Sequence, residues 1–302
     1  MPQEQATAQI DSASSFEIKI EFEKHSERPS RVFQSMAQMI DSFQLVDNDL
    51  LAPFDVRAET FLVLEDIQAG SLRTVLTTML RSVDDESLKS GDWKKVVGRY
   101  LLKSKHLLLR FLENKNQITE RSEIENLASD IHTLAVETDI KQLPSYKPVP
   151  QILLLRDIQQ ITLSLEPLKL TDTAKFIANQ QEIQFNQSFQ YHQDSIEALL
   201  TKETKTLERP EKLKVKKPDY LGESMWEFIF QNRVIPVKIV DHDWLLRFQS
   251  RLVDVRPGDA LSVILQTQIN YGFHGEEIAV HYRIVKVADV FRSTSGEQGD
   301  LF

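Results

Sequence analysis

The chain has 302 residues, of which 41% are hydrophobic and 27% are charged, and it contains no cysteine. This composition is typical of a folded protein of about two domains, and it excludes disulfides, thiolate metal sites and a cysteine nucleophile. The formal net charge of -9 argues against attraction of the whole protein to nucleic acid or anionic lipid, although it permits a local basic surface.

Residues 1–15 are expected to form a polar, disordered lead-in. This stretch has neither the basic start nor the apolar core of a signal peptide. No apolar run further along reaches the roughly 18 residues that a membrane span requires. We therefore expect no transmembrane segment, and the lack of cysteine favours a reducing, cytoplasmic location.

An α/β domain with a helical hairpin is predicted for residues 16–145. Apolar and charged residues alternate over Phe16–Glu23, which is the period of a half-buried strand. A helix is expected from about Arg28, because its apolar residues recur every three or four positions. Two strands, Val56–Asp66 and Ser71–Thr78, are expected on either side of a turn at an alanine-glycine pair.

Two longer amphipathic helices, Asp92–Glu113 and Ser122–Glu137, are predicted next. Ser122 followed by Glu125 has the spacing of a capping box at the start of the second helix. A short polar connection makes an antiparallel helical hairpin the expected arrangement.

A middle α+β segment, residues 146–205, is expected to pack on the first domain after the proline-rich break Leu143–Pro150. It begins with the predicted helix Gln151–Leu165 and continues with a short helix near Asp172. A predicted strand then carries four apolar residues on one face: Ile183, Phe185, Phe189 and Tyr191. A further helix is expected to end near Lys202.

A small β-rich domain, residues 206–292, is predicted after a boundary in the charge-dense segment Lys202–Lys217. Five or so strands and one short helix, led by a capping aspartate, indicate a barrel or a sandwich-like module. The overall fold class is therefore α+β. The predicted elements are Trp226–Phe230, Val234–Val240, the helix Asp243–Gln249, Leu261–Tyr271 and Glu277–Val290.

The densest group of potential metal ligands is His274, Glu276, Glu277 and His281. Glu277 and His281 share the outer face of a predicted strand, but four residues along a strand span about 13 Å, which is too far for both to bind one ion. The favoured interpretation is a solvated face, so no metal and no cofactor is predicted.

No catalytic residue is predicted either. Glu17 and Lys19 have the acid-x-lysine spacing of metal-dependent nucleases, but no acidic partner precedes them, and an exposed strand face explains both. Asp241 and His242 form a possible acid-base pair, for which a helix cap is the simpler explanation. Phosphate-binding loops, dinucleotide fingerprints, nucleophile elbows and zinc-protease motifs do not occur in the sequence.

Basic residues line one face of the predicted helix Asp92–Glu113. They recur every three or four positions, opposite the apolar stripe: Lys95, Arg99, Lys103, His106 and Arg110. In an acidic protein this face is a local inversion of charge. It suits nucleic acid, an acidic partner or an anionic membrane surface, and it equally suits a plain solvated helix.

Residues 293–302 are predicted to form a flexible polar tail. Its last five residues resemble the short motif by which bacterial replication and repair proteins dock on the DNA sliding clamp. In that motif glutamine is followed by any residue, serine or aspartate, leucine and phenylalanine. The resemblance implies that Gln298 is the polar anchor, that Asp300 takes the serine-or-aspartate position, and that Leu301 and Phe302 enter a hydrophobic pocket. The second position holds glycine, where leucine is more usual.

The β-rich domain carries a second resemblance, through Lys216–Phe228, Asp241–Phe248 and Arg256–Leu261. These segments resemble a C-terminal domain of uncharacterised bacterial proteins from variable genomic regions, some near phage-defence genes. The resemblance implies no activity.

Three hypotheses follow. The first is a non-enzymatic bacterial interaction protein, recruited by its tail to the DNA sliding clamp and acting in defence against phage or mobile DNA. The second is an effector enzyme, such as a metal-dependent nuclease, whose site is assembled from distant residues. The third is a structural or regulatory subunit of a complex, in which the tail has no role.

Overall fold

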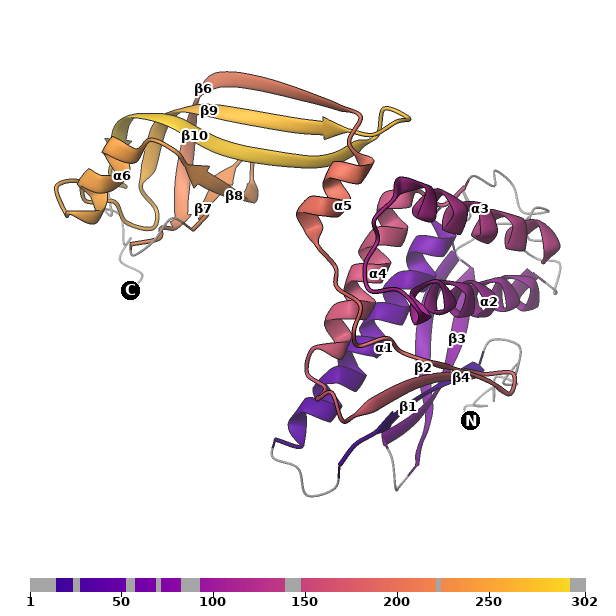
Figure 1. Cartoon of the computed structure of the whole chain (residues 1–302). Coiled ribbons are helices and arrows are strands. Elements are labelled where there is room, and N and C mark those ends of the chain that lie inside the picture. Colours follow the sequence, from indigo (N-terminus) through magenta and orange to yellow (C-terminus); the bar gives the residue numbers. More distant parts are fainter. Residues whose placement is uncertain are drawn as a thin grey trace, which may run out of the picture. The chain divides into compact units, whose positions relative to one another are not determined.

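The computed structural model describes residues 15–23, 28–52, 58–68, 72–82, 93–138, 148–220 and 224–293 (Figure 1). The chain divides into two compact units, Met1–Leu199 and Leu200–Phe302. The described residues form six helices and two β-sheets, which confirms the α+β class. None of the helices in this part of the chain combines the length and the hydropathy needed to cross a bilayer.

The first unit contains a five-stranded sheet in the order β2-β3-β1-β4-β5, and every neighbouring pair is antiparallel. Its strands are β1 (Ser15–Glu21), β2 (Ala58–Gln68), β3 (Leu72–Ser82), β4 (Thr173–Ala178) and β5 (Gln181–Gln184). The middle segment of the chain thus contributes two strands to the sheet of the first domain.

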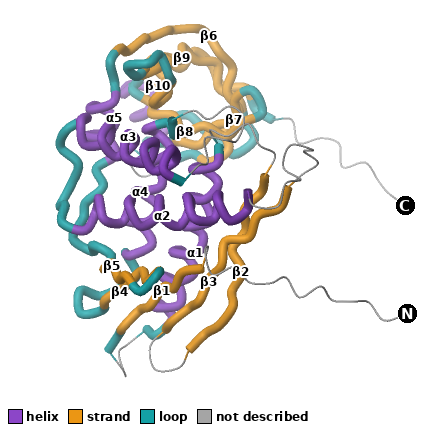
Figure 2. The backbone as a smooth tube through the Cα atoms, turned by 90° about the vertical axis from the view of Figure 1, so that its right-hand side faces the viewer, coloured by secondary structure: helices purple, strands orange, loops and turns teal. Residues whose placement is uncertain are grey.

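Four helices cover one face of this sheet: α1 (Ser30–Leu51), α2 (Trp93–Glu113), α3 (Arg121–Glu137) and α4 (Gln151–Leu165). Helices α1 and α2 contact the sheet, while α4 packs along α1 and α3 packs along α2 (Figure 2). Aromatic rings fill the layer between helices and strands. Phe16 of β1 lies 5.4 Å from Phe43 of α1 and 5.1 Å from Phe176 of β4, measured between ring centroids.

Three expectations for the first unit are wrong in detail. The capping box of α3 is formed by Glu120 and Glu123, because the helix begins at Arg121 and so includes Ser122. The short helix expected near Asp172 is strand β4, whose side chains alternate between buried and half-buried.

The third concerns the predicted strand with Ile183, Phe185, Phe189 and Tyr191 on one face. Strand β5 ends at Gln184, and the backbone N–H of Phe185 still donates to the carbonyl of Ala174. After this residue the Asn186 side-chain amide donates to the carbonyls of Leu112 and Lys115, at the end of α2. Helix α5 (Gln193–Leu200) follows.

The second unit is a closed five-stranded barrel in the order β10-β8-β7-β6-β9, which decides between the two predicted architectures. Its elements are β6 (Glu203–Lys217), β7 (Trp226–Phe230), β8 (Arg233–Ile239), α6 (His242–Gln249), β9 (Ala260–Tyr271) and β10 (Glu277–Phe291). Only β8 and β10 pair in parallel among these described strands. Going around the barrel from β6, the strands follow in the order β6, β7, β8, β10 and β9. Helix α6 lies between β8 and β9 in the chain. This is the arrangement of the OB-fold, a Greek-key barrel.

Most of the charge-dense segment Lys202–Lys217, in which the domain boundary was predicted, is strand β6 of this barrel, and the two units divide between Leu199 and Leu200. Its first eight residues are exposed on both faces and still pair with β9, while only Leu213 and Val215 are buried. The barrel core is mostly aliphatic and includes an aromatic cluster, in which the Trp226 ring lies 4.8 Å from that of Phe248 on α6.

Candidate anion-binding site

His106, which was predicted to lie on the basic side of helix α2, is half-buried. The apolar side of the helix packs into the first unit, and Lys95, Arg99, Lys103 and Arg110 are exposed on the other side. We call these four residues the basic face. Within the described residues, no carboxylate forms an ion pair with any of them. Their charges are therefore available to a partner.

Lys105 lies on the opposite side of the same helix and is fully buried. Its Nζ lies 2.6 Å from Oδ1 of Asp47 and donates to Oδ2 of Asp47 at 2.8 Å and to Oγ1 of Thr78 at 2.9 Å. Burial lowers the pKa of Lys105 and raises the pKa of Asp47, while their mutual attraction opposes both changes. This pair was not predicted from the sequence, although Lys105 falls at helical spacing among buried leucines.

A surface pocket of about 350 Å³ lies beside the basic face. Three side chains of α2 that carry polar groups line it: Lys103, His106 and Arg110. Leu102, Leu107, Leu134 and Ala178 form an apolar floor, and Asn179 and Gln181 complete the described lining. We call this hollow the α2 pocket. None of these lining residues is a carboxylate, so the pocket suits an anionic ligand electrostatically.

The turn between β4 and β5 brings the side-chain amides of Asn179 and Gln181 to the pocket. Asn179 and Gln180 both have positive φ, at 48° and 64°. Two such residues between paired strands form the turn that favours asparagine at its first position. The turn places Asn179 and Gln181 beside α2, which lies far from them in the sequence. Sequence spacing within α2 alone gives no signal for either amide or for Leu134 of α3.

His106 is half-buried at the pocket. Burial lowers the pKa of His106 below its ordinary value, nearby Arg110 lowers it further, and Glu113 opposes the change. At neutral pH its ring is therefore mostly uncharged. Its Nε2 is buried and has no hydrogen-bond partner in the part of the chain that the structure describes. The described lining thus offers two cations and two side-chain amides, which can bind an anion but include no nucleophile activated by a base.

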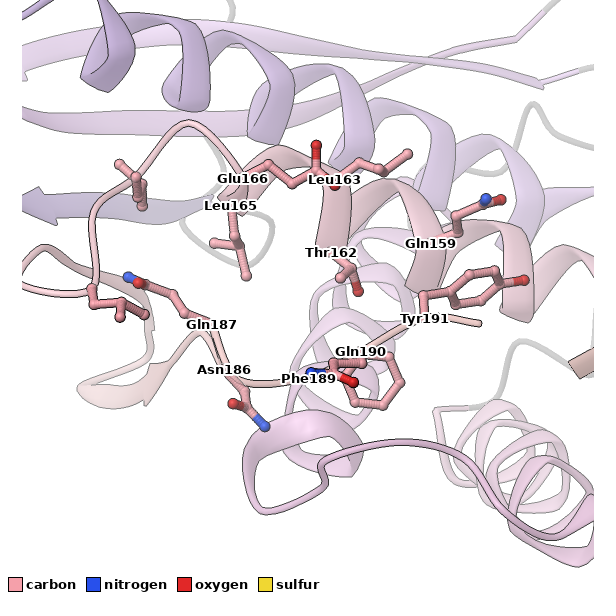
Figure 3. A pocket seen from close by; sticks show the side chains of 12 residues that line it. Gln159, Thr162, Leu163, Leu165, Glu166, Asn186, Gln187, Phe189, Gln190 and Tyr191 are labelled. Atoms are coloured by element: carbon pink, nitrogen blue, oxygen red, sulfur yellow. The ribbon is translucent and has the colours of Figure 1, made fainter. Parts of the chain in front are cut away.

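A second hollow, of about 400 Å³, lies between α4 and the segment that follows β5 (Figure 3). Its amides already have partners: Gln187 donates to the carbonyl of Asp172, and Asn186 donates to the end of α2. Burial raises the pKa of Tyr191 to about 12, and Glu166 adds a carboxylate to the lining. None of its described lining residues is a cation, so the α2 pocket is the better candidate for an anion.

Structural contacts account for several of the residues considered as metal ligands or nuclease residues. Oε2 of Glu276 accepts from the backbone N–H of His274 at 2.8 Å, while Glu277 and His281 are paired in register with Tyr271 and Gln268 of β9. Glu17 pairs with Arg73, and Lys19 lies 2.6 Å from Glu21. Among the described residues, no three histidines or carboxylates are grouped to hold a metal ion.

Asp241 caps α6, as predicted. It accepts a hydrogen bond from the backbone of Trp244 at 3.1 Å and another from Val287 of β10 at 3.0 Å. This cap accounts for the carboxylate beside His242. It also ties the helix to the last strand of the barrel.

The clamp-like residues Gln298, Asp300, Leu301 and Phe302 lie outside the described residues. No protein-family model, no curated protein and no solved structure matches the chain.

Proposed function

We propose that this chain is a non-enzymatic interaction protein that binds the phosphate groups of nucleic acid through the basic face of α2. The observation that carries the proposal is the exposure of four cations that no described carboxylate neutralises, beside a pocket whose described lining is free of carboxylates. Phosphate contacts by lysine and arginine release counterions and supply most of the affinity of non-specific binding.

The distribution of charge makes this face unusual within the protein. Leu200–Phe302 contains as many basic as acidic residues, so the formal charge of -9 belongs to Met1–Leu199. The basic face therefore lies on the acidic unit. Because an acidic surface repels nucleic acid, binding to this unit is confined to the place where the charge is reversed.

The test is fluorescence anisotropy with labelled single-stranded and duplex oligonucleotides at several salt concentrations. The triple variant K95Q/R99Q/K103Q should bind more weakly, and its log-log salt slope on duplex should flatten by about 0.9 for each phosphate that the variant no longer neutralises. The matched control removes three exposed cations elsewhere: Lys169→Gln, Arg247→Gln and Arg251→Gln. Equal weakening by the control, or no binding by the wild type, rules out the proposal. Cleavage of the probe with Mg²⁺ or Mn²⁺ would instead favour the nuclease hypothesis.

We also propose that Gln298–Phe302 recruits the protein to the DNA sliding clamp of a bacterial host. The similarity of these residues to the clamp-docking motif supports this second proposal. A clamp pull-down with the intact chain, with L301A/F302A and with the last five residues deleted is the direct experiment. Equal recovery of all three forms would remove the clamp from the proposal.

A role in defence against phage or mobile DNA is the cellular context in which we place both interactions. It is supported by the resemblance of the barrel segments to proteins encoded near phage-defence genes. Plating of phage on cells with the intact chain and with L301A/F302A measures it. Unchanged plaque numbers with and without the intact chain count against a defence role.

A further inference from the structure

The α2 pocket has a feature that phosphate binding leaves unexplained. Its floor is apolar, formed by Leu102, Leu107, Leu134 and Ala178. A phosphate group gains nothing from contact with such a floor, because burying a charge against apolar side chains costs free energy. The ligand that fits the whole pocket has an anionic part for its cations and a flat or apolar part for its floor.

We infer that the α2 pocket receives the base of an unpaired nucleotide, and that the protein therefore prefers single-stranded nucleic acid. This inference rests on the proposed function and names the form of nucleic acid that the basic face selects. The volume of about 350 Å³ lies within the range of small-molecule sites, roughly 300–1,000 Å³. The face of a base packs on the leucines, which removes apolar surface of both from water.

The cations are placed to contact the backbone on both sides of that base. Lys103 and Arg110 are seven residues apart on α2, which is two turns or about 10 Å along the helix axis. His106 and Leu107 lie between them and line the same pocket. A nucleotide seated over Leu107 therefore has one cation near each of its flanking phosphates.

The polar rim matches the edge of a base. Asn179 and Gln181 each carry an amide donor and an amide acceptor, and both side chains are exposed at the pocket. Bases present both donors and acceptors on the edges that pairing leaves free. A duplex keeps these edges and faces in its stack, and extruding a base from it costs free energy.

The experiment compares three probes of equal length by fluorescence anisotropy at one salt concentration: a single strand, its duplex and an abasic strand. Wild type should bind the single strand about tenfold more tightly than the abasic strand, as expected for one well-seated base. Leu107→Ala removes most of the apolar surface on which the base would pack and leaves the charge unchanged, so it should reduce this preference and leave duplex binding as it was. Val136→Ala, on the exposed side of α3 and outside the pocket, is the matched control.

A second variant guards against misfolding of the first. Asn179→Asp keeps the side-chain volume, and aspartate tolerates the left-handed backbone of the turn. The variant places a carboxylate at the pocket. It should therefore weaken single-strand binding more than duplex binding. Equal binding of the abasic strand and the single strand by wild type overturns the inference while leaving phosphate binding intact. Binding of none of the probes overturns the proposed function itself.

Discussion

Replacing Asp157 by asparagine should stabilise the first unit at neutral pH. The Asp157 side chain lies on α4 and is fully buried. Burial, and next the negative charge of Asp49, raise the pKa of Asp157 to about 9 from an ordinary value of 3.8. Between these two values the folded protein retains a proton that the unfolded chain releases. The contribution of Asp157 to stability is therefore greatest below about pH 4 and falls as pH rises through this window.

The size of the effect follows from the distance between the ordinary pKa and neutral pH. The ordinary pKa of 3.8 lies about three units below pH 7, and each unit corresponds to about 1.4 kcal/mol. Asp157 therefore lowers the free energy of unfolding by up to about 4 kcal/mol at neutral pH. An asparagine side chain cannot ionise and has nearly the same shape. The variant should gain about this much relative to wild type between pH 4 and pH 7, with little further gain above pH 9.

Urea unfolding followed by circular dichroism at 222 nm measures this difference, because most described helices belong to Met1–Leu199. The comparison is made at pH 4, 5.5, 7 and 8.5, so that groups common to both proteins cancel. Asp130→Asn, at an exposed carboxylate on α3, is the matched control and should give parallel curves. Parallel curves for Asp157→Asn itself would refute the reasoning, because they would mean that Asp157 titrates alike in the folded and unfolded states.

Two further stability predictions concern buried polar contacts. Lys105→Met leaves the buried carboxylate of Asp47 without its cation and should cost about 3–5 kcal/mol, whereas the double variant D47N/K105M should cost much less; urea unfolding of both measures the difference. Asp241→Ala removes the cap of α6 and the acceptor for the backbone of Val287, so it should cost about 1–3 kcal/mol, read from the thermal unfolding of the barrel by near-ultraviolet circular dichroism. A destabilisation below about 0.5 kcal/mol would show that water replaces both bonds.

Elements with a clear period and a clear stop were predictable from the sequence. Gln151–Leu165 and Trp226–Phe230 have the same bounds in the prediction and in the structure. The helix Gln151–Leu165 follows a proline that fixes its start, and its apolar residues repeat at helical spacing. In such segments local conformational preference and burial favour the same structure, so tertiary contacts stabilise it without changing it.

The errors arose where burial is set by distant partners. Strand β6 has no alternation over its first eight residues, because both faces are exposed and pairing with β9 alone holds it in place. Backbone pairing leaves no mark on the pattern of side chains. The segment Thr173–Ala178 alternates over only six residues, which is too short a stretch to identify a strand from the sequence, and a short helix was predicted near Asp172 instead. Such strands are recognised only when the sheet that receives them is known.

The candidate site also has one part that the sequence predicts and one part that depends on distant residues. The basic face followed from spacing within one helix, and the structure exposes all four of its cations. The pocket did not follow, because its other residues come from α3 and from the turn between β4 and β5. A helix predicts its own faces but not its neighbours, so the chemistry of the pocket depends on information that no local pattern contains.

The buried Lys105 connects the stability of α2 with the orientation of its basic face. Its ammonium group binds Asp47 of α1 and Thr78 of β3 at one point inside the unit. Separating such a pair leaves a buried charge uncompensated, which is strongly unfavourable. The pair therefore favours the orientation of α2 in which Lys105 faces inward, and in this orientation Lys103 and Arg110 line the pocket. We accordingly expect the double variant D47N/K105M to remain folded and yet to show a weaker preference for single strands in the anisotropy comparison.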